Sequence, residues 1–130
     1  MKIAIATKNF SSVSGHAGQA RKWLIYDLSG QNPGAPLPSP ACVELAREQV
    51  IHRFNEVGPH PLDGVDLVVA GSAGDGFIAR MEKRGSEVRL TGELDPAAVI
   101  NRILAGEPLP EKRFDITTSF CKLHDLFSRH

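Results

Sequence analysis

The sequence Val65-Asp66-Leu67-Val68-Val69-Ala70-Gly71-Ser72-Ala73-Gly74-Asp75-Gly76 joins a short apolar run to a glycine-rich turn. A second apolar run, at residues 3–6, opens the chain. Each run is short and lacks regular alternation of apolar and polar residues, which favours strands buried on both faces. We therefore expect two neighbouring, parallel central strands. The loops that follow them should meet at the edge of the sheet where open α/β proteins bind ligands.

Further elements are predicted between these two runs. Residues 23–28 follow the first strand closely, so antiparallel pairing with it is expected. Residues 35–37 leave room for a short edge strand. A helix is predicted over residues 39–58, because Ser39 and Pro40 form a typical helix start and a Gly-Pro pair follows. Its apolar stripe consists of Val43, Ala46, Val50, Phe54 and Val57.

The second half of the chain predicts a helix, a strand and another helix. The first helix spans residues 75–84, the strand spans residues 87–90, and Asp95 with Pro96 begins a last helix that ends at Gly106. The first helix should bury Phe77, Ile78 and Met81. This order predicts an α/β fold with a mixed sheet, helices on both faces and right-handed crossovers.

The composition is that of one domain without a dominant charge. The chain has 130 residues, and no apolar run approaches the roughly 20 residues needed to cross a bilayer. Its 15 basic and 15 acidic residues cancel, so no overall charge attracts nucleic acid or a membrane. The N-terminus lacks a signal-peptide pattern, and the two cysteines, Cys42 and Cys121, lie far apart. We expect a cytoplasmic protein that binds neither nucleic acid nor a membrane.

The first candidate site is the loop Ser14-Gly15-His16-Ala17-Gly18-Gln19-Ala20-Arg21. It places one imidazole between glycines, which permit positive φ and the close approach of a ligand. Imidazole is the commonest metal-ligating side chain, so His16 is a candidate ligand to a metal or a cluster. A histidine that only caps a turn is the alternative interpretation.

The second candidate site is the turn at residues 71–76, between a predicted strand and a predicted helix. Backbone amides in the first turn of that helix can point at an anion. The glycine spacing does not fit a dinucleotide-binding fingerprint. Asp75 at the N-cap would occupy the same amides and oppose an anion, which is the alternative interpretation.

Taken together, these motifs resemble the dinitrogenase iron-molybdenum cofactor-binding family, whose members are nitrogenase accessory domains that carry the cofactor or its precursor. The resemblance rests on the opening residues 1–7, the loop at residues 14–18 with the run at residues 23–27, residues 64–74 and the helix that ends near Leu109. We expect a family domain at residues 1–109 and a tail at residues 110–130 outside the match. Ala17 stands where the family loop usually has an aromatic residue.

The resemblance implies a ribonuclease H-like, three-layer fold and a non-enzymatic carrier or chaperone. Its cargo would be an iron-sulfur-type cluster, either the iron-molybdenum cofactor or a precursor, and its partners would be nitrogenase or cofactor-assembly proteins. The implied metal ligand is His16. The other predicted binding residues are Gly15, Gly18, Arg21, Gly71, Ser72 and Gly74.

The sequence also suggests two other functions. An interaction or regulatory module with the same fold and no cofactor is the alternative. A nuclease, which the fold also suggests, is disfavoured because a Mg²⁺ site needs converging carboxylates, and the candidates do not form an evident cluster. These candidates are Asp27, Asp66 and Asp75.

The tail contains a second possible metal half-site. Cys121 and His124 are three residues apart, which places them on one face if this segment is helical. In the alternative interpretation, Cys121 is a small buried residue and His124 lies on the surface. The tail also holds enough apolar residues that we expect it to dock against a surface.

Overall fold

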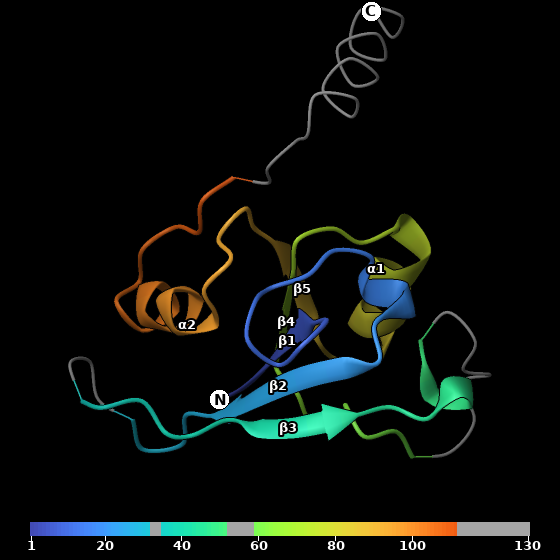
Figure 1. Cartoon of the computed structure of the whole chain (residues 1–130), viewed down its shortest axis with the longest axis horizontal. Helices are drawn as coiled ribbons and strands as arrows, with labels where there is room; N and C mark the ends of the chain where they lie inside the picture. The colour runs from blue at the N-terminus through green and yellow to red at the C-terminus, as the bar shows by residue number, and fades with distance from the viewer. Residues whose placement is uncertain (32–34, 52–58, 112–130) are drawn as a thin grey trace, which may run out of the picture.

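The computed structural model describes residues 1–31, 35–51 and 59–111 (Figure 1). Five strands form one mixed sheet in the order β3-β2-β1-β4-β5. The elements are β1 (Lys2–Thr7), β2 (Lys22–Asp27), β3 (Ala41–Glu44), β4 (Leu67–Ala70), α1 (Asp75–Lys83), β5 (Glu87–Leu90) and α2 (Pro96–Leu104), with short 3₁₀ turns at Ala17–Gln19 and Arg47–Gln49.

The two predicted central strands are neighbours in the sheet. β1 pairs in parallel with β4, with Ile5 opposite Val69, and in antiparallel with β2, with Ile5 opposite Leu24. β4 pairs in parallel with β5. The predicted parallel pairing of β1 with β4 and the predicted antiparallel pairing of β1 with β2 are therefore both confirmed. The chain segments that follow β1 and β4 leave the sheet at the same end, the carboxyl end of these parallel strands.

Alternate residues of β1 face opposite sides of the sheet and meet different helices. Ala4 belongs to the buried cluster that includes Phe77 of α1. Ile5 belongs to the cluster that includes Val99 of α2. β1 is apolar on both faces because both faces are covered. The sheet lies between the two helices (Figure 1), so the predicted three-layer, ribonuclease H-like α/β arrangement is confirmed.

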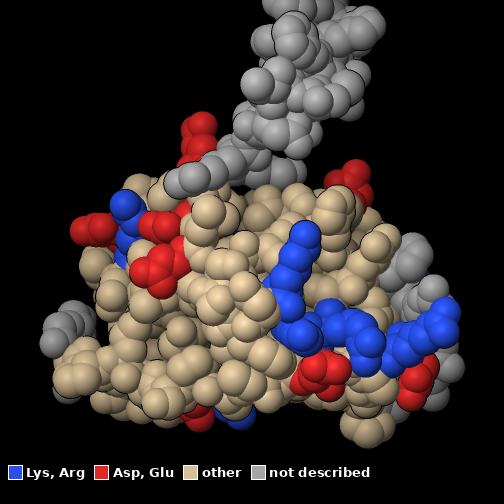
Figure 2. Space-filling model, in the orientation of Figure 1, with Lys and Arg blue, Asp and Glu red and all other residues tan. Residues whose placement is uncertain are grey.

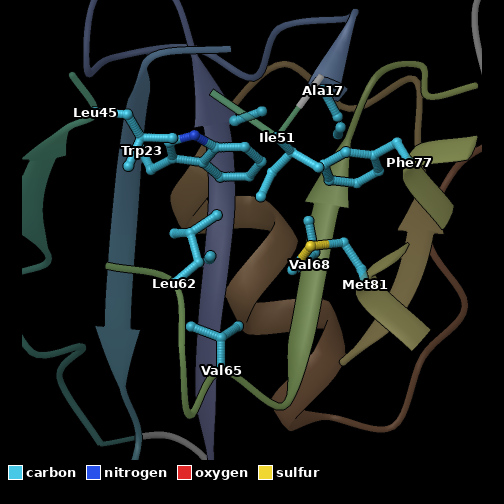
Figure 3. Close-up of a cluster of buried hydrophobic side chains, with 12 residues drawn as sticks. Ala17, Trp23, Leu45, Ile51, Leu62, Val65, Val68, Phe77 and Met81 are labelled. Atoms are coloured by element: carbon cyan, nitrogen blue, oxygen red, sulfur yellow. The ribbon is translucent and has the colours of Figure 1, made fainter. Parts of the chain in front are cut away.

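The cluster on the α1 side is built around an aromatic pair (Figure 3). The rings of Trp23 and Phe77 stack with centroids 6.4 Å apart and planes 9° apart. Trp23 also donates its indole N–H to the Ala20 carbonyl oxygen at 3.1 Å, so its one polar group is satisfied. This pair ties β2 to α1 across the end of the sheet where the candidate loops lie.

The described part of the predicted helix, residues 39–51, is not helical in the predicted way. β3 occupies Ala41–Glu44 and pairs antiparallel with β2, and the 3₁₀ turn at Arg47–Gln49 follows. The edge strand expected near residues 35–37 is absent there, since the edge strand of the described sheet is β3. Phe54 and Val57, which belong to the predicted stripe, fall outside the described residues.

Burial explains why the helical spacing misled here. Leu45 is 0% exposed and Ile51 is 3% exposed, yet neither lies on the predicted stripe. Both side chains join the Trp23 cluster (Figure 3). In addition, β3 hydrogen-bonds to β2, whose backbone would otherwise form an unpaired sheet edge. Tertiary packing therefore overrides the local pattern.

The predicted boundaries of the two helices are confirmed, with one correction. Asp95 accepts a hydrogen bond from the Ala97 amide at 3.1 Å and caps α2, as predicted. The N-cap of α1 is Gly74, without a side-chain cap bond, and Asp75 is the first helical residue. Asp75 therefore does not cap its own helix. No helix in the described ranges is long and apolar enough to cross a membrane.

Candidate functional site

The histidine loop and the turn after β4 lie side by side at the carboxyl end of the parallel strands. Ser14 accepts a hydrogen bond from the Gly71 amide at 2.8 Å. The Ala17 amide donates to the Ser72 carbonyl oxygen at 3.0 Å. These main-chain bonds hold the loop against the turn. The two regions that the sequence singled out are thus one structural unit.

Two of the predicted binding glycines allow this close approach. A Cβ atom on Gly15 would stand 2.6 Å from Ser72 Oγ, which is closer than real Cβ contacts. A Cβ atom on Gly71 would stand 3.4 Å from the Ser14 carbonyl oxygen. Gly15 of the histidine loop is approached by the turn after β4, and Gly71 of that turn is approached by the histidine loop. Gly71 and Ser72 accordingly hold the histidine loop and line neither of the pockets described below.

His16 has an unusual backbone and an unengaged side chain. Its φ is 54° and its ψ is 51°, in the left-handed region that residues other than glycine rarely adopt. Its amide donates to Ser72 Oγ at 2.8 Å, which fixes this conformation. The residue is exposed, and within the described part of the chain its ring makes no hydrogen bond. The ring therefore does not cap the 3₁₀ turn that begins at this residue.

A pocket of about 290 Å³ lies between this loop and α1. It is lined by His16, Gly18, Gln19, Ile51, Gly74, Gly76, Phe77 and Arg80. A Cβ atom on Gly74 or Gly76 would meet nothing within 4 Å, so these two glycines leave open space at the start of α1. We call this cavity the α1 pocket.

The start of α1 gives the α1 pocket a positive polarity. The intrahelical bond from the Ile78 amide reaches the Gly74 carbonyl oxygen at 3.1 Å. The amides of residues 75–77 precede this bond, and no side chain caps them from the N-cap position. Such a helix terminus favours negative charge. The predicted geometry of the turn is thus present, with Gly74 rather than Asp75 as the cap.

The structure places Arg80, rather than the predicted Arg21, in the α1 pocket. The Arg21 guanidinium donates to the Leu45 carbonyl oxygen at 3.1 Å and pairs with Glu44 at 3.5 Å, on the other side of the loop. Arg80 lines the α1 pocket and donates to the Ile51 carbonyl oxygen. The sequence signal for Arg80 was its spacing, one helical turn after Gly76, which puts both on one helix face.

A buried histidine contacts the 3₁₀ turn that ends two residues before Ile51 of the α1 pocket. The His60 ring is 5% exposed, accepts from the Leu62 amide at 3.0 Å through Nδ1 and contacts the Gln49 carbonyl oxygen through Nε2. The proton therefore belongs on Nε2. The His60 amide in turn donates to Asp63 at 2.8 Å. This bond, followed by the bond from Arg84, lowers the pKa of the Asp63 carboxyl below its usual value.

The structure does not test the other predicted metal ligands, Cys121 and His124, because both lie outside the described residues. Cys42 is exposed on β3. Across residues 1–31, 35–51 and 59–111, no group of three or more His, Cys, Asp or Glu side chains gathers to hold a metal ion. His16 therefore stands alone as a candidate ligand within these ranges.

A family model, described as dinitrogenase iron-molybdenum cofactor, matches residues 1–106. The chain belongs to this family. The match contains the whole of the α1 pocket and ends close to the predicted domain boundary at Leu109. No curated protein matches the sequence.

Solved structures share the fold of this family member. PH0822 superposes with a TM-score of 0.57 at 24% identity, covering 82% of this chain and 91% of its own. A NifB-like protein from Thermotoga gives a TM-score of 0.55 at 20% identity, covering 88% and 96%. A dinitrogenase-like protein from Methanocaldococcus jannaschii gives 0.56 at 16% identity, covering 82% and 90%. At these identities the likeness establishes the fold alone.

Proposed function

We propose that this protein is a non-enzymatic carrier of an iron-sulfur-type cluster, either the iron-molybdenum cofactor or a precursor of it. His16 would be the protein ligand, and the α1 pocket would receive the cluster. The observation that carries this proposal is the His16 ring, which is exposed beside the pocket and has no hydrogen-bond partner among the described residues, while its backbone is fixed by Ser72.

The donor set favours a preassembled cluster over a bare metal ion. A zinc or iron ion that is held by protein alone needs three or four side-chain ligands. The described ranges contain no such group. A cluster brings its own bridging sulfides, so a single imidazole can complete the coordination of one of its metals. The family to which the chain belongs is named for such a cofactor.

Electrostatics in the α1 pocket fit a negatively charged cargo. The amino end of α1 and the Arg80 guanidinium both border the cavity, and no carboxylate is among its lining residues. Gly74 and Gly76 present backbone without side chains, which lets a bulky anion approach the helix amides.

A carrier fits the placement of the carboxylates better than a nuclease does. The Lys2 amide donates to Asp66 at 2.9 Å, and Lys2 pairs with Asp27 across the sheet, so both carboxylates lie at the amino end of β1. Asp75 begins α1 at the opposite end. The three candidates for Mg²⁺ binding are therefore split between two ends of the sheet, whereas Mg²⁺ chemistry needs them together.

One imidazole bond also suits delivery. A cluster that is held by many protein ligands is slow to leave, whereas one bond with electrostatic support permits transfer. The receiving partners would be nitrogenase or cofactor-assembly proteins, as the family suggests.

The test is anaerobic reconstitution of the purified protein with iron and sulfide, followed by metal and sulfide analysis and absorption spectra. The parent protein should acquire a cluster, His16→Ala should acquire little or none, and Cys121→Ser should match the parent. If the parent acquires no cluster from iron, sulfide or a cluster donor, the regulatory-module alternative holds instead. If Cys121→Ser loses the cluster while His16→Ala keeps it, the ligand lies in the tail.

A further inference from the structure

A second pocket, of about 300 Å³, lies on the other side of His16. We call it the β1 pocket because its lining begins with the last residue of β1. It is lined by Thr7, Lys8, Ser14, Gly15, His16, Gln19, Ala20, Arg21 and Lys22. His16 and Gln19 border both cavities, so they form the partition between them. The proposed carrier function gives the β1 pocket no role.

An unpartnered hydroxyl group opens into the β1 pocket. Ser14 is 9% exposed, and its main-chain amide and carbonyl groups bond to Ala6 and Gly71. Its Oγ makes no hydrogen bond to any described residue. Among the described residues, no buried side-chain polar atom lacks a hydrogen-bond partner, so this unpartnered hydroxyl keeps access to solvent. It can therefore donate a hydrogen bond to a ligand that enters the cavity.

Three basic side chains surround the same cavity. Lys8 is exposed, and it makes no hydrogen bond or ion pair within the part of the chain that the structure describes. Lys22 places its ammonium 5.7 Å from the centre of the Phe10 ring. Arg21 shares its guanidinium with Glu44, and its side chain remains 53% exposed. Figure 2 shows Lys and Arg side chains gathered on the side of the molecule where β2 begins.

This concentration of positive charge is local, since the whole chain has no net charge. No Asp or Glu is among the residues that line the β1 pocket, and Glu44 forms an ion pair with Arg21. A hydroxyl group together with ammonium and guanidinium groups is the donor set that proteins use for carboxylates and phosphates.

We propose that the β1 pocket binds a small free oxyanion, a carboxylate or a phosphate, through Ser14 and Lys8 with support from Arg21 and Lys22. The oxyanion would lie next to the cluster site, because His16 and Gln19 border both cavities. The binding site is complete in the protein without a cluster. It therefore stands independently of the proposed carrier function.

The test is an NMR titration of the ¹⁵N-labelled, cluster-free protein with inorganic phosphate and, separately, with citrate. Chloride replaces the anion so that ionic strength stays constant, because screening alone moves surface resonances. The amides of Ser14, Gly15 and Lys22 should shift in a saturable way with at least one of the two anions. The titration uses the cluster-free protein, so its outcome does not depend on cluster uptake.

Two variants and one control make the result decisive. Ser14→Ala should weaken binding about tenfold, the loss expected for one charge-assisted hydrogen bond, and leave the thermal midpoint unchanged because its Oγ has no described protein partner. Lys8→Ala should also weaken binding. Lys2→Ala, which removes the same charge at the other end of β1, should bind like the parent.

Three results would overturn the proposal. The first is the absence of a saturable shift with either anion. The second is equal weakening by Lys2→Ala and Lys8→Ala, which would indicate general charge attraction. The third is parent-like binding by Ser14→Ala.

Discussion

Gly15 lies so close to Ser72 that a Cβ atom on Gly15 would stand 2.6 Å from the Ser72 hydroxyl oxygen, the atom that also accepts the His16 amide at 2.8 Å. The position of His16 therefore depends on two neighbours that are not proposed as ligands. Gly15 leaves room for the Ser72 side chain, and Ser72 Oγ accepts the hydrogen bond from the His16 amide.

This relationship predicts a specific pattern of coupled mutations. Gly15→Ala should destabilise the fold by about 1–3 kcal/mol because the new methyl group clashes with Ser72 Oγ. Ser72→Ala should cost about 1 kcal/mol for the lost hydrogen bond. The double variant should be more stable than the sum of the two losses, because removal of Oγ leaves a Cβ distance of 3.7 Å. Urea denaturation of all four proteins measures the coupling, and additive losses would contradict it.

The backbone of His16 allows stability and ligation to be separated. His16→Gly should leave the protein as stable as the parent or up to about 1 kcal/mol more stable, because glycine tolerates the φ of 54°. His16→Ala keeps the left-handed conformation and should leave the thermal midpoint nearly unchanged. Both variants should lose cluster uptake. Thermal scans and reconstitution of the same samples test this, and a cluster-loaded His16→Gly protein would exclude the imidazole as the ligand.

Gly76 permits a test of the α1 pocket that does not damage the core. A Cβ atom there meets nothing within 4 Å, and Gly76 lies in the first turn of α1. Gly76→Ala should therefore stabilise the protein by up to about 1 kcal/mol through helix propensity. Gly76→Leu should fill the cavity and block cluster uptake while the fold is retained. Circular dichroism and reconstitution would show this, and full uptake by Gly76→Leu would place the cargo elsewhere.

Asp63 predicts an acid-sensitive contribution to stability. The His60 amide and Arg84 lower the pKa of its carboxyl below the reference value of 3.8. Folding therefore favours the carboxylate, so its stabilisation is fully present above that reference value and is lost as the pH falls through the lower, folded-state pKa. Asp63→Asn should be less stable than the parent at neutral pH, and the difference should shrink below about pH 4. Thermal midpoints across pH measure it, with Glu82→Gln as the control for an exposed carboxylate.

The family domain should fold without most of the tail. Leu109 packs against the α2-side cluster, and the Pro110 carbonyl oxygen accepts from Thr91 Oγ1 at 2.8 Å. A chain that ends at Glu111 should therefore unfold cooperatively near the parent midpoint, whereas one that ends at Leu109 loses the Thr91 partner and should be about 1 kcal/mol less stable. Calorimetry of both chains tests this. Loss of cooperative unfolding in the longer chain would show that the tail belongs to the core.

Most of the fold was predictable from the sequence because its signals are local. The apolar runs of β1 and β4 show burial on both faces, and Asp95 with Pro96 marks the start of α2. Residues 41–49 form an edge strand and a 3₁₀ turn instead of the predicted helix, because tertiary packing overrides the local helical spacing of the apolar residues. Only tertiary contacts show that β2 needs a partner on its open side and that Leu45 fills the space beside Trp23.

The part of the candidate site that follows from strand pairing was predictable from the sequence. Parallel β1 and β4 imply that the His16 loop meets the turn at Gly71, and it does. Which arginine enters the α1 pocket depends on side-chain contacts across the fold. Arg21 is adjacent to the loop in sequence but is engaged by Glu44, whereas Arg80 reaches the cavity from α1. The local sequence around each arginine does not show which partners its side chain will have in the fold.

The hydrogen bonds that hold the histidine loop come almost wholly from main-chain atoms, with the Ser72 hydroxyl as the side-chain acceptor. The loop conformation therefore does not depend on hydrogen bonds from the side chain at position 16, so that side chain can be exchanged without loss of these bonds. A thiol or a carboxylate placed there by His16→Cys or His16→Asp would be presented at the same spot with a different metal preference. A single substitution at position 16 can therefore change which metal or cluster the protein prefers, while the backbone of the loop keeps its conformation.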